Sequence, residues 1–309
     1  MKPVVRVLET YLNHCRCEKR LDAKTVKAYR CDLEQFLAWT TGRPCMWSEV
    51  AKGDMAAYIA HLNGRFAPAS VKRKIASLRA FYAYCETEEL VPVTPFHGLK
   101  VSIREPKRLP RTIPLADLNR MFDQAEGASG ESSYEQFRRA RDRAIIEVLI
   151  ATGVRVSELC GLDDADFDGV SKTLLIFGKG SKERIIQVEN ESTLSAIESY
   201  RAQRNVWRVE RDPALFVNRF GFRMTEQSVR NMVASLAERA EASTHITPHM
   251  FRHTFATLLL EEDVDIRYIQ RLLGHSSIKT TEIYTHVTST KLRAILKDHN
   301  PRSAIGTAR

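Results

Sequence analysis

The sequence predicts a mainly α-helical protein with one small antiparallel β-sheet, organised in two domains. Apolar residues recur at helical spacing from about residue 3 to residue 88, and again over much of the chain after residue 115. Two β-rich runs, 173–177 and 183–188, flank a glycine-containing turn and indicate a hairpin. The length of 309 residues, with 43% hydrophobic and 28% charged residues, is typical of a globular protein of about two domains.

The N-terminal region is expected to form four helices, near residues 4–17, 23–40, 54–64 and 69–88. The fourth begins after Pro68, a residue that suits the first helical turn. The two longer helices each carry an apolar stripe that would pack against their neighbours. The stripe of the second helix is Val26, Tyr29, Leu33, Phe36 and Leu37, and that of the fourth is Val71, Ile75, Leu78, Tyr82 and Cys85.

A proline-containing connector follows, over residues 91–114. The spacing of its prolines favours an extended segment over a helix, because proline lacks an amide hydrogen and clashes with the preceding turn. Such a segment could lie along a polyanion, or it could be an ordinary solvated linker. Its basic residues are Lys100, Arg104, Lys107, Arg108 and Arg111.

The stretch from Thr247 to Phe255 predicts a helix with a defined start. Thr247 is a favourable N-cap and Pro248 suits the first helical position. Apolar residues then follow at helical spacing and define a stripe that we expect to be buried. The stripe consists of Phe251, Phe255, Leu258 and Leu259.

His249 and Arg252 lie three residues apart near the start of this helix, on the face away from the stripe. Free amide groups and the helix dipole favour an anion at this end. The small Ala256 shares the face and would let a backbone approach closely. The pattern therefore indicates a phosphate site, although a short H-x-x-R motif by itself is also typical of a solvated polar face.

Upstream, Gly153 ends an apolar run, 144–150, that we expect to be a buried helix. Arg155 stands at the start of the next segment and would present its guanidinium from an otherwise buried region. That group offers a planar set of donors that matches two phosphate oxygens. Glu158 could hold Arg155 in place by a charge-assisted hydrogen bond. The alternative is a structural Arg–Glu pair on a helix surface.

The predicted hairpin places Lys179 at its tip, between Gly178 and Gly180. A site for a nucleoside triphosphate is excluded here, because the G-x-x-x-x-G-K-[ST] pattern is absent and no helix follows directly. The Lys179 side chain could reach into a groove and donate a proton, since lysine pKa values respond readily to their surroundings. A flexible, solvated turn lysine is the other interpretation.

Two further candidates, His275 and Tyr284, lie towards the C-terminus. Taken alone, His275 could be part of a helix C-terminal cap formed by Gly274, and Tyr284 could be an ordinary amphipathic aromatic. Together with the motif at 249–252, however, these candidates form a set of two histidines, one arginine and one tyrosine that spans residues 249–284. These side chains can grip a phosphodiester and attack it with a phenol.

These ordered motifs resemble those of the tyrosine recombinases, specifically their phage-integrase and Xer-like branch. The similarity is strongest over residues 144–162, 173–188 and 247–287. It implies two arginines that clamp the scissile phosphate, two histidines that complete the set, a lysine that protonates the leaving 5′-oxygen and a tyrosine nucleophile that forms a 3′-phosphotyrosyl link. In this sequence the set is Arg155, Arg252, His249, His275, Lys179 and Tyr284. The chain departs from the family in a longer polar insertion around 126–133 and a longer tail after the tyrosine.

The resemblance also implies a helical core-binding domain over residues 1–90, a basic linker over 91–114 and a catalytic domain with a C-terminal tail over 115–309. The two domains would form a C-shaped clamp around duplex DNA. For each residue expected to contact DNA, the alternative is an ordinary solvated side chain. These residues are Lys24, Lys27, Lys72, Arg73, Arg79, Lys100, Lys107 and Arg108.

The expected partner is double-stranded DNA with inverted-repeat half-sites, bound by a homotetramer or by a tetramer shared with a paralogous recombinase. The formal net charge of +9 and the pI of about 9.3 fit a polyanionic partner. No cofactor and no metal are expected, since this chemistry needs neither and the sequence lacks an H-E-x-x-H or acidic metal motif. Six cysteines without a C-x-x-C pair favour reduced thiols in a cytoplasm, and no apolar run is long enough to span a bilayer.

Three functions compete at this point. The first is a site-specific recombinase that serves integration or excision of a mobile element, or the resolution of chromosome dimers. The second is an enzyme similar to type IB topoisomerases, which would relax supercoils as a monomer with the same arginine, lysine and tyrosine chemistry. The third is a non-catalytic DNA-binding protein. The order of the motifs and the helical N-terminal domain favour the first, and the intact set of catalytic residue types argues against the third.

Overall fold

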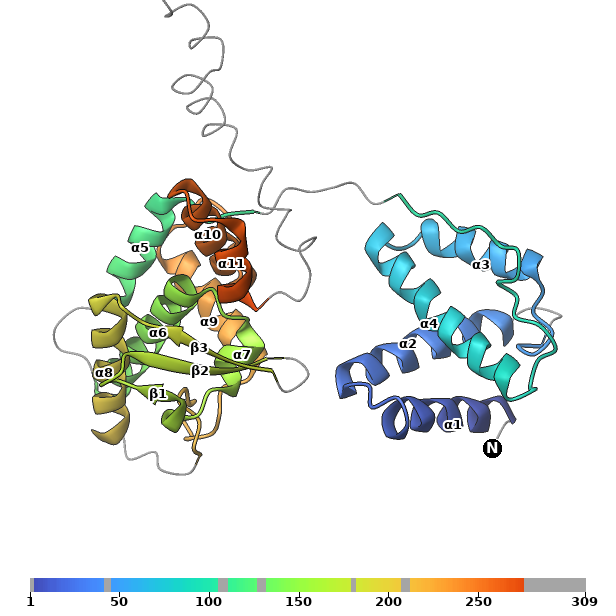
Figure 1. Cartoon of the computed structure of the whole chain (residues 1–309), viewed down its shortest axis with the longest axis horizontal. Helices are drawn as coiled ribbons and strands as arrows, with labels where there is room; N and C mark the ends of the chain where they lie inside the picture. Colours follow the sequence, from blue (N-terminus) through green and yellow to red (C-terminus); the bar gives the residue numbers. More distant parts are fainter. Residues whose placement is uncertain are drawn as a thin grey trace, which may run out of the picture. The chain divides into compact units, whose positions relative to one another are not determined.

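The chain divides into two compact units, Met1–Lys107 and Arg108–Arg309 (Figure 1). The structure is a computed structural model that describes residues 3–41, 46–104, 111–126, 132–178, 182–206 and 212–274. Within these ranges the protein is mainly helical, with one three-stranded antiparallel sheet. The predicted fold class is therefore confirmed. None of the helices in these ranges is long and apolar enough to cross a membrane.

The N-terminal unit contains four helices, α1 (Pro3–Cys17), α2 (Ala23–Thr41), α3 (Lys52–Asn63) and α4 (Pro68–Thr87). All four lie within two residues of the predicted bounds. They enclose an aromatic-rich core that includes Tyr11, Phe36, Tyr58, Phe81 and Tyr82. Tyrosine and phenylalanine bury large areas, so a few such residues stabilise a small four-helix unit. Val91 is buried in the same core, with Phe96, Leu99, Val101 and Ile103 packed against it.

A buried polar network joins α2 to α4 inside this unit. Asp32 is almost fully buried and accepts hydrogen bonds from Lys74 Nζ at 3.0 Å and Ser77 Oγ at 2.8 Å. Arg73 forms an ion pair with the same carboxylate. Lys74 also donates to Gln35 Oε1 at 2.7 Å. A buried carboxylate is tolerated only when its charge and lone pairs are satisfied in this way.

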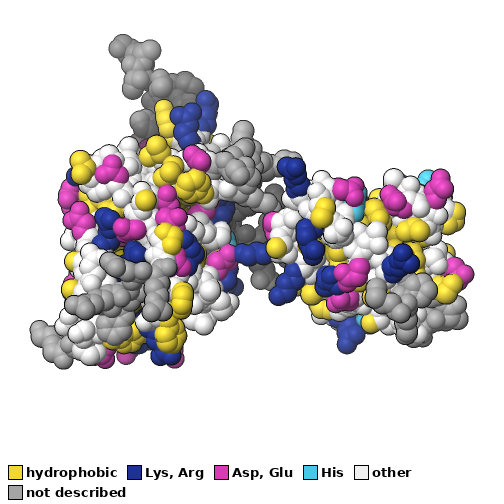
Figure 2. Space-filling view, turned by 90° about the horizontal axis from the view of Figure 1, so that it is seen from below, with side chains coloured by type: hydrophobic (Ala, Val, Ile, Leu, Met, Phe, Trp, Pro, Cys, Tyr) yellow, Lys and Arg dark blue, Asp and Glu magenta, His cyan; other side chains and the backbone are white. Residues whose placement is uncertain are grey.

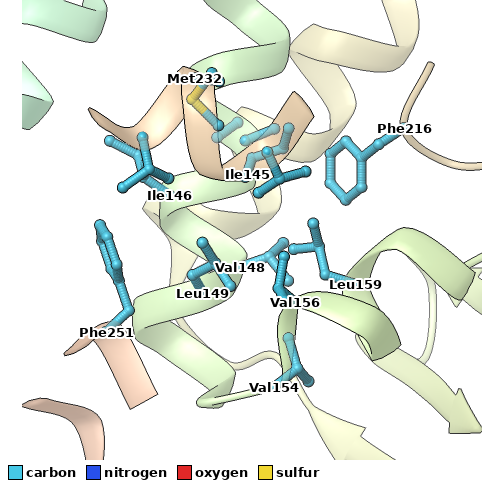
Figure 3. Close-up of a cluster of buried hydrophobic side chains, with 14 of the residues drawn as sticks. Ile145, Ile146, Val148, Leu149, Val154, Val156, Leu159, Phe216, Met232 and Phe251 are labelled. Atoms are coloured by element: carbon cyan, nitrogen blue, oxygen red, sulfur yellow. The ribbon is translucent and has the colours of Figure 1, made fainter. Parts of the chain in front are cut away.

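The C-terminal unit is built around α6 (Ser133–Thr152), whose run at 144–149 is fully or almost fully buried, as predicted. Figure 3 shows Ile145, Ile146, Val148 and Leu149 of this helix in contact with side chains from several other elements. The surrounding helices are α5 (Leu115–Glu126), α7 (Val156–Gly161), α8 (Glu191–Val206), α9 (Glu226–Arg239), α10 (Pro248–Glu261) and α11 (Ile266–Leu273), with a 3-10 turn η1 at Asp164–Asp166.

The predicted hairpin is present as β2 (Thr173–Gly178) and β3 (Lys182–Gln187), and a short strand β1 (Phe167–Asp168) completes the sheet in the order β1-β2-β3. The register pairs Leu174 with Ile186 and Ile176 with Arg184. Side chains alternate between the two faces of a strand, so Arg184 lies on the same face of β3 as the buried Ile186. The hairpin therefore turns a charged residue towards the core.

Candidate active site

Gly153 ends α6 in the left-handed conformation, with φ of 61°, and its amide donates to Leu149 O at 3.1 Å. The predicted break of the helix at this glycine is confirmed. A Cβ atom at position 153 would lie 2.5 Å from Cδ1 of Phe255 and 2.9 Å from Cδ2 of Leu273. Only glycine suits this position, because it adopts a positive φ without strain and leaves room for both neighbours.

Arg155 is the N-cap residue of α7 and is held by Glu158, as the sequence suggested. Its Nη1 donates to Glu158 Oε1 at 2.7 Å, and its backbone amide donates to Glu158 Oε2 at 2.9 Å. Glu158 is buried, whereas the Arg155 side chain is 35% exposed. Glu158 thus fixes the guanidinium of Arg155, while the arginine side chain as a whole remains partly accessible to solvent.

Arg184 binds the same carboxylate from the hairpin. Its Nη1 donates to Glu158 Oε1 at 3.1 Å and its Nη2 donates to Glu158 Oε2 at 2.8 Å. Burial tends to raise the pKa of Glu158, but the hydrogen bonds and charges of Arg184 and Arg155 outweigh it and hold the pKa below its usual range. Glu158 is therefore a carboxylate at neutral pH, held between two arginines.

The start of α10 agrees with the prediction at Thr247 and Pro248, which are the N-cap and the first helical residue, although the Thr247 side chain makes no capping hydrogen bond. The predicted buried stripe is only partly correct. Phe251 is fully buried, while Phe255, Leu258 and Leu259 are half-buried.

Arg252 does not belong to a solvated polar face of α10, which was the alternative interpretation of the H-x-x-R motif. Arg252 is only 4% exposed, and its Nη1 and Nη2 donate to Gly153 O and Leu273 O, each at 2.7 Å. Ala256 on the same face is buried in a small cluster with Ile269 and Leu273. The reason is that the end of α6 and the end of α11 both close on this side of α10, so the guanidinium satisfies their carbonyl groups.

His249 lies in the first turn of α10, where it remains accessible to solvent although its ring is partly covered, and it is surrounded by positive charges. Partial burial of the ring lowers its pKa from 6.5, and the charges of Arg252, Arg230 and Arg155 lower it further, with Glu226 acting in the opposite direction. At neutral pH the imidazole is therefore uncharged. The same influences show that the starts of α7, α9 and α10 converge near this ring.

The end of α11 has the glycine cap that the sequence suggested. Gly274 has a φ of 62°, and its amide donates to Arg271 O at 3.1 Å. Arg184 Nε donates to Leu272 O at 3.1 Å. Two successive carbonyl groups of α11, those of Leu272 and Leu273, are thus capped by two arginine side chains from different elements.

The structure brings together Arg155, His249 and Arg252 of the predicted catalytic set. The other three, Lys179, His275 and Tyr284, lie outside the described residues. Within the described ranges, no group of three or more His, Cys, Asp or Glu side chains is arranged to hold a metal ion. Sequence reasoning missed Arg184 as part of this centre. The signal was available, since residue 184 alternates with the apolar Ile186 and Val188 along the strand.

The residues expected to contact DNA are distributed over α2, α4 and the segment after it. The side chains of Lys24, Lys27, Lys72, Arg79 and Lys100 are exposed. The Arg73 side chain is also exposed, but its guanidinium pairs with the buried Asp32, because α2 carries that carboxylate opposite α4. Arg79 also lies 5.3 Å from the ring of Phe96. Lys107 and Arg108 lie outside the described residues.

Each of the two units matches a known protein family. The model of the "Phage integrase family" matches residues 114–291, and that of the "Phage integrase, N-terminal SAM-like domain" matches residues 8–89. A tyrosine recombinase of Agathobacter rectalis is 43% identical over 298 residues, which cover 96% of each chain. The tyrosine recombinase XerC of Myxococcus xanthus is 35% identical and covers 96% of this chain and 98% of its own.

Solved structures of recombinases are similar to this chain as well. The XerA recombinase is similar with a TM-score of 0.54 and 29% sequence identity, over 96% of this chain and 98% of that chain. The fold also matches the XerH site-specific recombinase bound to its palindromic difH substrate, with a TM-score of 0.76, 23% identity, and coverage of 94% of this chain and 84% of that chain.

Proposed function

The chain belongs to the phage integrase family of tyrosine recombinases, which are DNA strand-transferring enzymes, and we propose that it cuts and rejoins duplex DNA at a defined site with Tyr284 as nucleophile. The observation that carries this proposal is the convergence of Arg155, His249 and Arg252 on one centre. Arg155 lies almost a hundred residues before the other two in the chain. Their side chains form a cationic centre with a neutral imidazole beside it.

In this proposal the two arginines stabilise the scissile phosphate. A phosphodiester under attack gains negative charge on its non-bridging oxygens, and fixed cationic donors lower the energy of that state. Arg155 is preorganised by Glu158 and partly exposed, and the guanidinium plane of Arg252 is set by two carbonyl groups. Loss of one such donor typically reduces the rate by about 10²–10³-fold.

Tyr284 supplies the nucleophile and Lys179 the proton for the leaving group. A phenol has a pKa of about 10, so nearby cations or a base must assist its deprotonation at neutral pH. The phenolic oxygen attacks phosphorus, the bond to the 5′-oxygen breaks, and Lys179 protonates that oxygen. A 3′-phosphotyrosyl link and a free 5′-hydroxyl result. Attack by the 5′-hydroxyl of another strand reverses the reaction and restores a phosphodiester. His249 and His275 are the remaining members of the proposed catalytic set.

The proposed partner is double-stranded DNA with inverted-repeat half-sites. The domains at 1–90 and 115–309, which the linker at 91–114 joins, would clamp this DNA. The XerH structure contains a palindromic substrate, and another neighbour is a lambda integrase dimer bound to a core site. Figure 2 shows several Lys and Arg side chains on one face of the N-terminal unit, on the right of the view. The proposed contacts are Lys24, Lys27, Lys72, Arg73, Arg79, Lys100, Lys107 and Arg108.

The proposed assembly is a tetramer on DNA, formed by this chain alone or with a paralogous recombinase. Its biological role would be either chromosome-dimer resolution or the movement of a mobile element. Relatives are named XerC, and a neighbour of similar fold is the integrase of the Tn1549 transposon. Both roles use the same strand-transfer chemistry.

The experiment that tests the proposal is covalent capture from genomic DNA. The protein is mixed with sheared DNA of its host, the reaction is stopped with detergent, and protein-linked fragments are sequenced. The Tyr284→Phe variant is run beside it, since it lacks only the nucleophilic oxygen. Tyr268→Phe is the matched control, because Tyr268 is 64% exposed on α11 and has no assigned role.

We expect capture of one short inverted-repeat locus by the wild type and by Tyr268→Phe, and no capture by Tyr284→Phe. Capture spread evenly over the genome would instead identify a topoisomerase-like enzyme. If the wild type binds DNA specifically but no capture is lost on Tyr284→Phe substitution, the proposed chemistry is wrong and the protein is a DNA-binding protein.

A further inference from the structure

Arg184 has a position that the proposed chemistry does not explain. It lies on β3 opposite Ile176, on the face that carries the buried Ile186, and its side chain is only 15% exposed. An apolar residue would ordinarily be expected there, because the alternation of the strand directs this face into the core. The desolvation of a guanidinium is costly unless its donors are matched by acceptors.

The acceptors of Arg184 belong to two different elements of the catalytic centre. Its Nη1 and Nη2 bind the two oxygens of Glu158 on α7, and its Nε donates to Leu272 O on α11. Glu158 is at the same time the residue that holds Arg155. One guanidinium thus connects the hairpin, the phosphate-binding arginine and the end of α11. A planar fork of donors is required for this, and a lysine ammonium cannot reproduce it.

The end of α11 is shaped around this side chain. A Cβ atom at Gly274 would lie 3.1 Å from Nη1 of Arg184 and 3.3 Å from its Cζ. The last carbonyl groups of a helix have no partner within the helix. Here Arg184 satisfies the carbonyl of Leu272, and Arg252 satisfies that of Leu273. The last turn of α11, up to Gly274, is therefore held by both arginines.

We propose that Arg184 is a positioning residue of the strand-transfer reaction, which aligns Arg155 through Glu158 and fixes the end of α11 against the hairpin. This inference rests on the proposed function. Because His275 follows Gly274 directly in the sequence, the hydrogen bond from Arg184 to Leu272 O lies close to the described end of the chain that leads to that histidine. Arg184 itself does not touch the phosphate in this proposal. It sets the arrangement of the groups that do.

The test measures single-turnover formation of the protein–DNA link. The probe is a nicked duplex that carries the locus captured by the wild-type protein, so that the released strand end diffuses away and the covalent product accumulates. Arg184→Met removes the donors with little change in length, and Arg184→Lys keeps the charge without the fork. Arg201→Met is the matched control, since Arg201 forms a similar two-point pair with Asp164 on another side of the unit, at 3.0 and 2.7 Å.

We expect Arg184→Met to reduce the rate by about 10-fold or more, less than the roughly 10²–10³-fold typical of losing a donor that itself contacts the reacting group. Arg184→Lys should lie between Arg184→Met and the wild type. Binding of the same duplex should be unchanged in both, and Arg201→Met should react at the wild-type rate. Melting temperatures identify a variant that does not fold. If Arg184→Met fails to fold, Arg184→Lys carries the test.

A double-mutant cycle and a pH profile separate positioning from general support of the fold. If Arg184 acts through Arg155, the effects of Arg184→Met and Arg155→Lys will not add. The charged groups that face Glu158 in the described structure are Arg155 on α7 and Arg184 on β3. Without Arg184 the pKa of Glu158 rises, so its hold on Arg155 weakens at a higher pH. The acidic limb of the rate profile should therefore move to higher pH in Arg184→Met.

Two results would overturn the inference, and they are distinguishable. If the wild type links to DNA through Tyr284 and Arg184→Met does so at the same rate, or with additive effects and an unshifted pH profile, the positioning role is wrong and the proposed function stands. If the wild type forms no link that depends on Tyr284, the proposed function is wrong and the positioning role falls with it.

Discussion

Gly153 is a residue at which the end of α6 meets both α10 and the end of α11. Its carbonyl accepts from Arg252, and the space beside its Cα is occupied by Phe255 and Leu273. We predict that Gly153→Ala destabilises the protein by about 1–3 kcal/mol from the left-handed backbone alone, with a further cost from the two contacts. The free energy of unfolding in urea measures this loss. The Arg252 guanidinium should also shift in Gly153→Ala, so this variant should capture less DNA covalently and also be less stable.

Gly161→Ala is the matched control for this prediction. Gly161 is the last residue of α7, and nothing lies within 4 Å of a Cβ atom built there. Alanine is favoured over glycine in helices by about 0.5–1 kcal/mol, so this variant should be neutral or slightly more stable. Equal losses of stability in the two variants would contradict the explanation given for Gly153.

His249 gives a prediction for the pH dependence of stability. Partial burial and nearby arginines lower its pKa in the folded protein below 6.5, the value expected for the unfolded chain. Below 6.5 the unfolded state therefore binds more protons at this residue than the folded state does. The free energy of unfolding should rise with pH through this window and become level above about 6.5 for this group.

The measurement is the pH dependence of urea unfolding for the wild type and for His249→Gln. The variant should show a smaller rise between the folded pKa of His249 and 6.5, because it lacks the group that titrates. The neighbouring His253 also has a lowered pKa, caused by burial and by His249 and Arg252, so part of the rise will remain. Identical slopes in the two proteins would show that His249 titrates normally.

At the scale of elements, the helices that pack with one face were the easiest to predict. The stripe of α4, for example, is buried at all five predicted positions, and α2 agrees at Val26, Leu33 and Phe36. The hairpin was predictable from its β-rich runs and glycines, and Gly153 and Gly274 from their place after apolar helical runs. These features depend on residues close together in the sequence.

The environment of α10 could not be predicted in the same way. Periodicity reports one apolar stripe, but the ends of α6 and α11 cover α10 on its other side. The end of α6 lies far before α10 in the sequence, and the end of α11 lies after it. Arg252 is consequently buried on backbone carbonyl groups, which carry no sequence signature. Likewise, the sequence suggested the Arg155–Glu158 pair, three residues apart, but not the arrival of Arg184 from β3.

Thr254 connects α10 to the start of the C-terminal unit, and we predict that Thr254→Val loosens this connection. Its Oγ1 accepts from the amide of Ile113 at 2.8 Å and donates to Met250 O at 2.8 Å, in a buried environment. Valine has the same shape but leaves the Ile113 amide without its partner, at a cost of about 1–3 kcal/mol. Thr10→Val is the control, since the exposed Thr10 bonds only to Arg6 O in its own helix. A similar change in unfolding free energy for both variants would contradict this role.

At the scale of the whole molecule, the two units have separate hydrophobic cores that share no residue among those described. Because each core is closed by its own helices, we predict that residues 1–107 fold without the rest of the chain and that full-length protein unfolds in two transitions. Differential scanning calorimetry of the full chain and of the 1–107 fragment measures both. The fragment should reproduce one of the two transitions. A single cooperative transition with an unfolded fragment would show that the units depend on each other.

The excess positive charge of the molecule gives the last prediction, which concerns salt. If the protein neutralises phosphates with lysine and arginine, binding releases counterions, and the logarithm of affinity falls with the logarithm of salt concentration by about 0.9 per contact.

Lys72 and Arg73 are adjacent on α4 and both exposed, but only Arg73 is paired with the buried Asp32. We expect Lys72→Ala to reduce the slope by about one contact without affecting stability. Arg73→Ala should in addition destabilise the N-terminal unit, because Asp32 keeps only Lys74 as its charged partner there. Fluorescence titrations of duplex DNA at several salt concentrations, together with urea unfolding of both variants, distinguish the two roles. An unchanged slope in Lys72→Ala would place the DNA on another face of the N-terminal unit.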